Sequence, residues 1–189
     1  MTSPVGSLAR ALCGRPRSLA DTHDAQCVIY HGPDTQHTNK ELCFNSNEDT
    51  ITVVDMSDKA NPVQISRTGY INDAYTHQSW LTEDHAYMLL NDELDEMEGF
   101  DGGRTRTLIF DMRDLDNPVH FADHLGADTA IDHNLYIRGQ YGFLSNYCAG
   151  LRILDVSQIA AGITPEVGFF DVAPNCASAS FAGTWSNYP

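Results

Sequence analysis

The stretch Ile51-Thr-Val-Val-Asp55-Met decides the fold, because it recurs without gaps as Thr107-Leu-Ile-Phe-Asp111-Met and Leu151-Arg-Ile-Leu-Asp155-Val. Each copy is a short run of β-branched and apolar residues that ends in an aspartate. The runs are nearly continuous rather than alternating, which is typical of strands buried on both faces. A carboxylate at the end of a strand can accept backbone N–H groups of the following turn. We therefore interpret the three aspartates as structural residues of a repeat.

A histidine marks the start of each repeat. His23 and His77 are 54 residues apart, and His77 and His133 are 56 residues apart. A proline follows two of the aspartates at the same interval of seven residues, and both Pro62 and Pro118 lie 15 residues before the histidine that marks the next repeat, His77 and His133 respectively. Because several offsets are preserved together, the pattern indicates a tandem repeat.

Each unit contains four short β-rich runs in about 50 residues, with almost no helical periodicity. Four-stranded units at this period predict a β-propeller, in which neighbouring blades cover both faces of each sheet. A β-sandwich would show alternation without the long period, and a WD40 propeller would show a shorter period and a Trp-Asp mark. We predict an all-β partial β-propeller over residues 21–189, with about three four-stranded blades plus the start of a fourth at Trp185.

The charge balance is strongly acidic and uneven. The chain has 26 acidic and 11 basic residues, for a net charge of −15, yet its first 20 residues contain three arginines and no acid. We interpret residues 1–20 as a non-homologous or disordered leader that lacks the continuous apolar run of a signal peptide. An acidic surface repels nucleic acid and anionic membranes, so we expect no nucleic-acid partner and no direct membrane insertion.

The cysteines allow two interpretations. Cys27 and Cys43 flank a turn-rich segment, which places them on neighbouring antiparallel strands within reach of one another. They form either a disulfide, as in an oxidising compartment, or a pair of buried thiols.

The repeated histidines are the first candidate site. His23, His77 and His133 occupy equivalent positions at the start of the innermost strands, which converge on the channel of a propeller. Together with Asp24 and Asp132 they can supply ligands for Zn²⁺ or another divalent metal. We favour a structural role, in which each histidine makes hydrogen bonds within its own blade, because a repeated structural role also explains the repetition.

An acidic loop is the second candidate site. Asp92, Glu93, Asp95 and Glu96 are dense oxygen ligands of the kind that Ca²⁺ binds, although their spacing is not that of an EF-hand. The alternative is a solvated hairpin loop whose charges stay in water.

Several separate stretches together resemble the LVIVD-repeat β-propellers, in particular the choice-of-anchor B family. The stretches are Thr22-His-Asp-Ala-Gln-Cys27-Val-Ile-Tyr30, Ser46-Asn-Glu-Asp49, Asp55-Met-Ser-Asp58-Lys-Ala-Asn-Pro62, Tyr75-Thr-His-Gln78, Leu90-Asn-Asp-Glu-Leu-Asp-Glu96, Ala130-Ile-Asp-His-Asn-Leu-Tyr136 and Ala149-Gly-Leu-Arg-Ile-Leu-Asp155. The resemblance implies an extracellular or cell-surface bacterial protein and transfers no catalytic residue. It also implies that this chain is a fragment of a longer protein, without the signal peptide and anchor of the family.

The sequence contains no G-x-S-x-G elbow, H-E-x-x-H pair, P-loop or G-x-G-x-x-G. We therefore expect a non-catalytic extracellular propeller that serves as a binding or scaffold module. The alternative is a metal-dependent, hydrolase-like enzyme that uses channel-facing histidines and carboxylates. An incomplete ring leaves blade faces open, so we also expect self-association.

Overall fold

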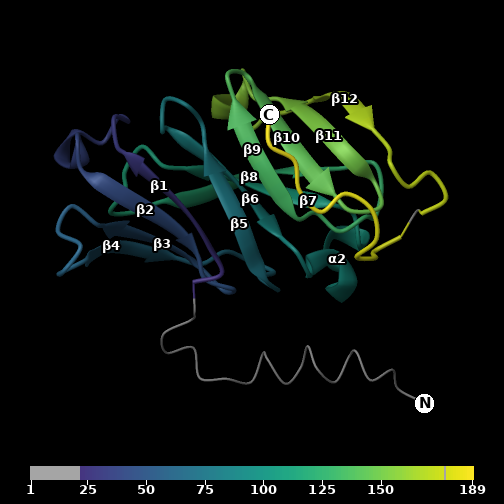
Figure 1. Ribbon diagram of the computed structural model, residues 1–189, viewed down its shortest axis with the longest axis horizontal. Helices are drawn as coiled ribbons and strands as arrows, with labels where there is room; N and C mark the ends of the chain where they lie inside the picture. Colours follow the sequence, from purple (N-terminus) through teal and green to yellow (C-terminus); the bar gives the residue numbers. More distant parts are fainter. Residues whose placement is uncertain (1–21, 177) are drawn as a thin grey trace, which may run out of the picture.

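The computed structural model describes residues 22–176 and 178–189. The predicted leader, residues 1–20, lies outside the described residues. The rest folds into three four-stranded antiparallel sheets, each built from strands consecutive in sequence (Figure 1). The predicted all-β fold, a partial β-propeller, is confirmed, and each sheet is one blade.

The strands of each blade run in chain order from the first to the fourth. Blade 1 contains β1 (Asp24–Ile29), β2 (Glu41–Ser46), β3 (Ile51–Asp55) and β4 (Val63–Thr68). Blade 2 contains β5 (Thr76–Leu81), β6 (Tyr87–Asp92), β7 (Arg106–Asp111) and β8 (Val119–Leu125). Blade 3 contains β9 (Asn134–Arg138), β10 (Tyr141–Asn146), β11 (Gly150–Asp155) and β12 (Glu166–Phe170). The short helical segments are η1 (Thr35–His37), α2 (Asp95–Glu98), η2 (Phe100–Gly102) and η3 (Ile159–Ala161).

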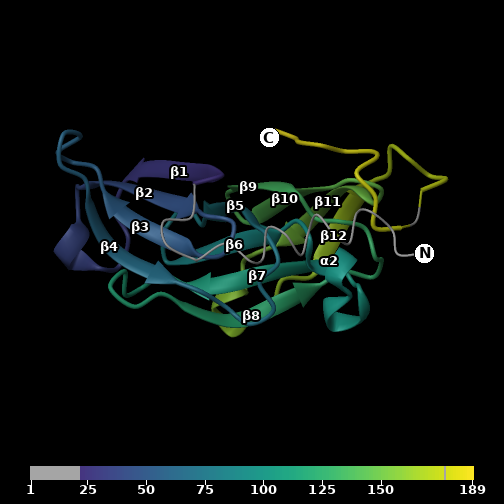
Figure 2. The ribbon, with the colours of Figure 1, turned by 90° about the horizontal axis from the view of Figure 1, so that it is seen from below.

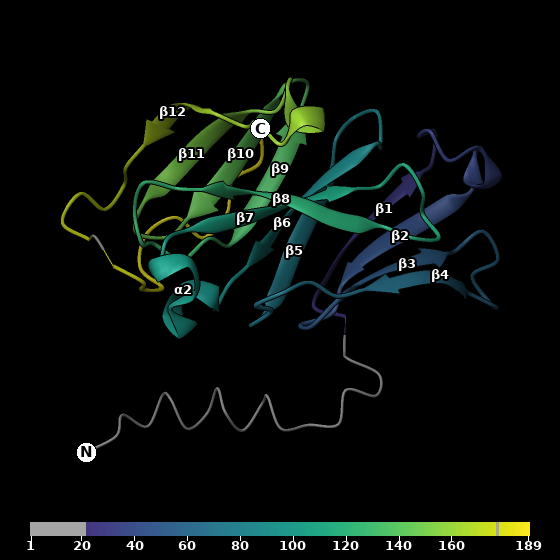
Figure 3. The same cartoon turned by 180° about the vertical axis from the view of Figure 1, so that it is seen from behind.

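The first strands of the three blades pack against one another. β1 contacts β5, and β5 contacts β9, so these three inner strands form the centre of the fold (Figure 1). Seen from behind, the sheets fan outward from this centre toward β4, β8 and β12 (Figure 3). The view from below shows the same fan on its side, with α2 projecting at one end of blade 2 (Figure 2). This radial arrangement is the geometry of propeller blades.

Blade 2 is buried on both faces, and its second strand shows why the repeat runs are continuously apolar. Every residue of β6 is buried. Met88 and Leu90 belong to the core shared with blade 1, whereas Tyr87 and Leu89 belong to the core shared with blade 3. Because successive residues of a strand point to opposite faces, a strand between two blades needs apolar residues at both parities. Burial of each such side chain contributes about 2 kcal/mol.

The last described segment occupies the place of a fourth inner strand. Thr184 forms an isolated bridge with Tyr147, as Thr76 does with Glu48 two blades earlier. The Asn187 amide donates hydrogen bonds to the hydroxyl of Ser145 at 2.7 Å and to a main-chain carbonyl of the same strand at 3.2 Å. The segment therefore continues the repeat beside blade 3.

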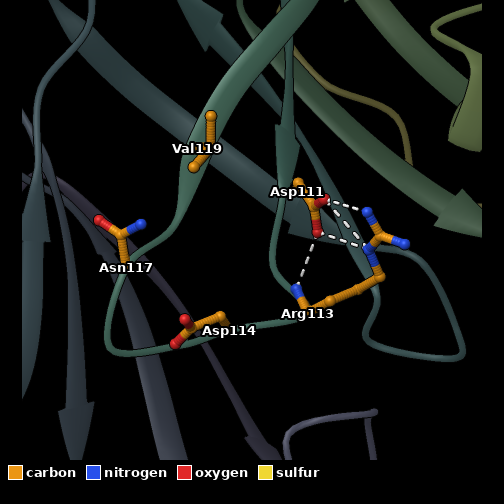
Figure 4. A pocket seen from close by; sticks show the side chains of 5 residues that line it. All are labelled: Asp111, Arg113, Asp114, Asn117 and Val119. Atoms are coloured by element: carbon orange, nitrogen blue, oxygen red, sulfur yellow. Dashed lines mark hydrogen bonds and ion pairs between the residues drawn. The ribbon is translucent and has the colours of Figure 1, made fainter.

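The three repeat aspartates each accept a backbone hydrogen bond from the turn that follows. The donors are the amides of Ser57, Arg113 and Ser157, at 3.0, 3.0 and 2.8 Å respectively. The bond from Ser57 is the main cause that lowers the pKa of Asp55 to about 2. The Asp111 carboxylate also pairs with the Arg113 guanidinium, at one edge of a surface pocket (Figure 4). The pair satisfies its own charges, so we assign this pocket no ligand.

Two disulfide bonds cross-link the described part of the chain. Cys27 and Cys43 lie directly opposite each other on β1 and β2 and are bonded. A second disulfide, which the sequence did not predict, joins Cys148 to Cys176. Among the described residues, no helix has the length and apolar character needed to span a membrane.

Candidate metal centre at the inner strands

Histidines at the start of the inner strands form a ladder that joins consecutive blades. The Nδ1 of His23 lies 3.0 Å from the main-chain carbonyl of His77, and the Nδ1 of His77 lies 3.1 Å from that of His133. The Nδ1 of His133 continues the series to the carbonyl of Trp185, at 2.6 Å. Neighbouring rings pack in a tilted arrangement at centroid distances of 4.2 Å and 4.1 Å. Each histidine therefore bonds to the next blade, rather than within its own blade as we expected.

The ladder favours one tautomer of each imidazole, and at His133 the Asn134 side-chain amide, 2.9 Å from Nδ1, donates to the same Trp185 carbonyl at 3.0 Å. A carbonyl oxygen can only accept, so Nδ1 must carry the proton, and Nε2 of the neutral ring keeps its lone pair. Burial, followed by the neighbouring His133 and His23, lowers the pKa of His77 to about 3. Burial is also the main cause that lowers the pKa of His133. Both rings are therefore neutral at physiological pH, with Nε2 free to act as a ligand.

One carboxylate faces the two free nitrogens. Glu93, which follows β6, places Oε2 at 3.7 Å from Nε2 of His77 and Oε1 at 3.4 Å from Nε2 of His133. The Tyr147 hydroxyl donates to the same Oε1 at 2.7 Å. Both histidines are buried, but the Glu93 side chain remains 14% exposed, so the cluster opens to solvent on its carboxylate side.

The three groups have no hydrogen with which to bond to one another. Two imidazole lone pairs and a carboxylate are all acceptors, and their ligand atoms lie within 4.8 Å of one another. Two histidine nitrogens and one carboxylate oxygen are a ligand set that Zn²⁺ and related metals use. Metal-binding histidines typically donate their other ring nitrogen to a carbonyl or carboxylate, as the ladder does here.

The structure brings only part of the predicted histidine site together. His77 and His133 converge, but His23 is exposed at the end of the ladder and contacts Tyr75 and His77. Asp24 turns back to accept a hydrogen bond from the Ala25 amide at 2.5 Å.

Asp132 points away from the ladder. It is fully buried, and it accepts a hydrogen bond from the Thr107 hydroxyl in the interface between blades 2 and 3. Two residues that contact these histidines or their carboxylate were not predicted in that role from the sequence: Glu93, which we assigned to the calcium loop, and Tyr147.

The four acidic residues of the predicted calcium loop lie in different environments and do not form one site. Asp92 accepts four hydrogen bonds, from the Tyr70 hydroxyl and from three main-chain amides. Glu93 joins the histidines. Asp95 forms a buried ion pair with Arg106 at 2.7 Å, and Glu96 lies between Asp95 and the interface with blade 3.

The carboxyl groups of this loop have strongly raised pKa values. Burial, followed by the charge of Asp92, raises the pKa of Asp95 to about 7. Burial, followed by the charge of Asp95, raises the pKa of Glu96 to about 10. Burial, followed by the charge of Glu96, raises the pKa of Asp132 well above its usual range. Such values mark a buried acidic cluster whose negative charge is incompletely balanced.

A second histidine–carboxylate group has a structural explanation. Asp34, His37 and Asp116 also lie close enough to share an ion. The Asp34 carboxylate, however, accepts hydrogen bonds from the amides of Gln36 and Leu115 and so joins a loop of blade 1 to blade 2. Asp116 is exposed, so we assign no ligand to this group.

The class of protein that the fold defines is the β-propeller, and a comparison with solved structures agrees. The chain is similar to the periplasmic gluconolactonase PpgL of Pseudomonas aeruginosa, with a TM-score of 0.57 and 13% sequence identity over 80% of this chain. The similarity covers 41% of the length of that protein and shows the fold alone. No family model and no curated protein sequence matches the chain.

Proposed function

We propose that this chain is part of an extracytoplasmic β-propeller that binds a divalent transition-metal ion through His77, His133 and Glu93. The observation that carries the proposal is the convergence of Nε2 of His77 and Nε2 of His133 on the Glu93 carboxylate, at 3.7 and 3.4 Å. A bound cation converts this mutual repulsion into coordination, and the ladder holds both imidazoles in the tautomer that coordination requires.

The extracytoplasmic location is supported by the two disulfides, since disulfides persist in oxidising compartments. The periplasmic location of the structural neighbour and the resemblance to the LVIVD-repeat, choice-of-anchor B proteins agree with it. A cell-surface or exported propeller of that family would present the metal site at the end of its channel.

A metal-dependent hydrolase is the second candidate, beside a non-catalytic binding module. Three protein ligands leave an open coordination position for water or substrate, which is the pattern of catalytic rather than structural zinc sites. The Tyr147 hydroxyl, 2.7 Å from Glu93, places a proton donor beside that position. The structural neighbour is named a gluconolactonase, so a sugar lactone is the first substrate class to test.

The metal proposal is tested with substitutions that separate the two nitrogens of each ring. In His77→Asn and His133→Asn, the amide nitrogen takes the place of Nδ1 and preserves the ladder, while the ligand nitrogen Nε2 is lost. We expect the unmodified protein to retain about one zinc or cobalt ion per chain after desalting, and each variant to retain about a tenth of that or less. Retention is measured by plasma mass spectrometry, and the visible absorption of the cobalt form reports the nitrogen ligands.

The matched control is His23→Asn, which changes the exposed end of the same ladder. It should retain the metal. If the unmodified protein retains none, or if His23→Asn loses as much as the other two variants, the proposed site is wrong. Hydrolysis of gluconolactone by the metal-loaded protein, lost in His133→Asn, would favour the enzyme; a bound metal without turnover would favour the binding module.

A further inference from the structure

A layer of polar side chains is buried between blades 2 and 3, apart from the histidine ladder. Two carboxyl groups lie in it, those of Glu96 in α2 and Asp132 at the start of blade 3. The Asp132 amide donates to Glu96 Oε1 at 3.4 Å, and the Thr107 hydroxyl donates to Asp132 Oδ2 at 3.3 Å. Glu96 is 5% exposed and Asp132 is fully buried.

Two asparagines point into the same layer. Asn91 lies two residues after Leu89 in β6, and Asn146 lies two residues after Leu144 in β10. Both leucines pack in the core between blades 2 and 3, and alternate residues of a strand share a face, so both amides point into that interface. Asn91 also lies directly opposite Thr107, whose hydroxyl contacts Asp132.

Each of these four side chains has an oxygen without a hydrogen-bond partner. The unpartnered oxygens are Asn91 Oδ1, Glu96 Oε2, Asp132 Oδ1 and Asn146 Oδ1, and Nδ2 of Asn91 is unpartnered as well. A buried polar atom without a partner destabilises the fold, and more so when it is charged. Arg106 does not balance them, because its guanidinium pairs with Asp95 at 2.7 Å and donates to the carbonyl of Asn72 at 2.9 Å.

The interface between blades 1 and 2 provides an internal comparison. Thr76 and Asp92 occupy the places there that Asp132 and Asn146 occupy one blade later. Both oxygens of Asp92 are partnered, and the Tyr70 hydroxyl bonds to Asp92 and to Thr76, at 2.8 and 2.7 Å. The unpartnered oxygens are therefore a feature of the second interface and not of the repeat in general.

We propose that this layer is a calcium site between blades 2 and 3, formed by side-chain oxygens of Asn91, Glu96, Asp132 and Asn146. All four offer oxygen, the ligand that hard cations require, whereas the histidine site offers mostly nitrogen. Calcium accepts six to eight oxygens in flexible geometry, so main-chain carbonyls or waters complete the shell. The ion would bind residues from both blades and thereby join them.

The test uses the whole chain, unfolded and refolded in ~1 mM CaCl₂ so that the buried layer can bind the ion as it forms. After desalting, bound calcium is measured by plasma emission, and thermal unfolding is compared with a refold in chelator. We expect about one calcium per chain and a higher unfolding temperature. Glu96→Gln, which keeps the shape of the side chain, should lose both effects while remaining folded, and so should Asp132→Asn.

Three controls make the result specific. Glu98→Gln changes an exposed carboxylate of the same short helix and should keep the calcium and the temperature shift. Magnesium at the same concentration should not replace calcium. His77→Asn should also keep the calcium, so that a failure of the histidine site is told apart from a failure of this one. Refolded protein without calcium, or equal loss in Glu98→Gln, would overturn the proposal and leave the carboxyl groups holding protons instead.

Discussion

His77 donates its Nδ1 proton to the carbonyl of His133 at 3.1 Å, so a side chain of one blade bonds to the main chain of the next. Gln78 adds a second link of the same kind, because its amide group donates to the carbonyl of Leu135 and accepts from its amide, both at 2.9 Å. The inner strands are thus joined through side chains that bond to the neighbouring backbone. We expect these links to contribute to stability independently of any metal.

The first prediction concerns the ladder. His77→Ala removes the donor and leaves the buried carbonyl of His133 without a partner, so we expect the free energy of unfolding to fall by about 1–3 kcal/mol. His77→Asn keeps the donor and should lose less than about 1 kcal/mol. Urea unfolding in chelator measures both, and an equal loss in the two variants would contradict the role of the hydrogen bond.

The second prediction concerns the disulfides. Cys27 is exposed, whereas Cys148 is 1% exposed, so thiol reagents should reduce the bond between Cys27 and Cys43 first. Alkylation and mass spectrometry at increasing reductant give the order directly. Because the bonded residues are 16 apart, replacing both by serine should lower the free energy of unfolding by about 3 kcal/mol. Earlier labelling of Cys148 and Cys176 would contradict the expected order.

The third prediction is a pH dependence in the metal-free protein. Burial raises the pKa of Glu96 from its usual 4.5 to about 10, so between these values the folded protein binds more protons than the unfolded chain. The free energy of unfolding should therefore fall as pH rises through this window. Glu96→Gln removes the titrating group. In chelator, the free energy of unfolding of this variant should exceed that of the unmodified protein by at least about 1 kcal/mol at alkaline pH and by less in mild acid. A difference that does not change with pH would refute the prediction.

The fourth prediction concerns the outer strand of blade 3. Val167, Phe169 and Phe170 on β12 are 55%, 64% and 67% exposed, which is unusual for three apolar residues so close together. We expect the chain to self-associate through this surface and to bind a hydrophobic dye. Phe170→Ser should weaken association about tenfold in sedimentation experiments, and Met97→Ser, at an exposed site on α2, should not. A monomeric unmodified protein would rule this out.

The architecture was predictable because each repeat contains short sequence patterns that can be recognised without knowing which residues meet in space. The runs ending at Asp55, Asp111 and Asp155 became the third strands of three blades, and the histidine spacing fixed where each blade begins. A strand between two blades must be apolar on both of its faces. Because successive residues point to opposite faces, this requirement produces a run of consecutive apolar residues in the sequence.

The partner of the histidines was not predictable in this way. Glu93 corresponds to Glu48 in blade 1 but to Tyr147 in blade 3, so a glutamate at this position does not mark every blade. Its acidic neighbours made it look like part of a calcium loop. Only the packing of β5 on β9 shows that Glu93 reaches two rings from different blades.

Asp132 and His133 show a second limit. They are adjacent in the sequence, and the histidine faces the ladder while the aspartate lies between two blades. Neighbouring residues in extended chain point in opposite directions, so a sequence pair of this kind contributes to two separate sites.

The ladder has a consequence for how such a protein can diverge. The accepting half of every link is a main-chain carbonyl, which any amino acid supplies, and Trp185 already accepts in place of a histidine. A blade can therefore exchange its own histidine for another residue and still be held by the blade before it. Loss of one histidine donor would remove a single hydrogen bond between two blades. The remaining bonds between blades would keep their geometry, although the histidine repeat would become harder to recognise in the sequence.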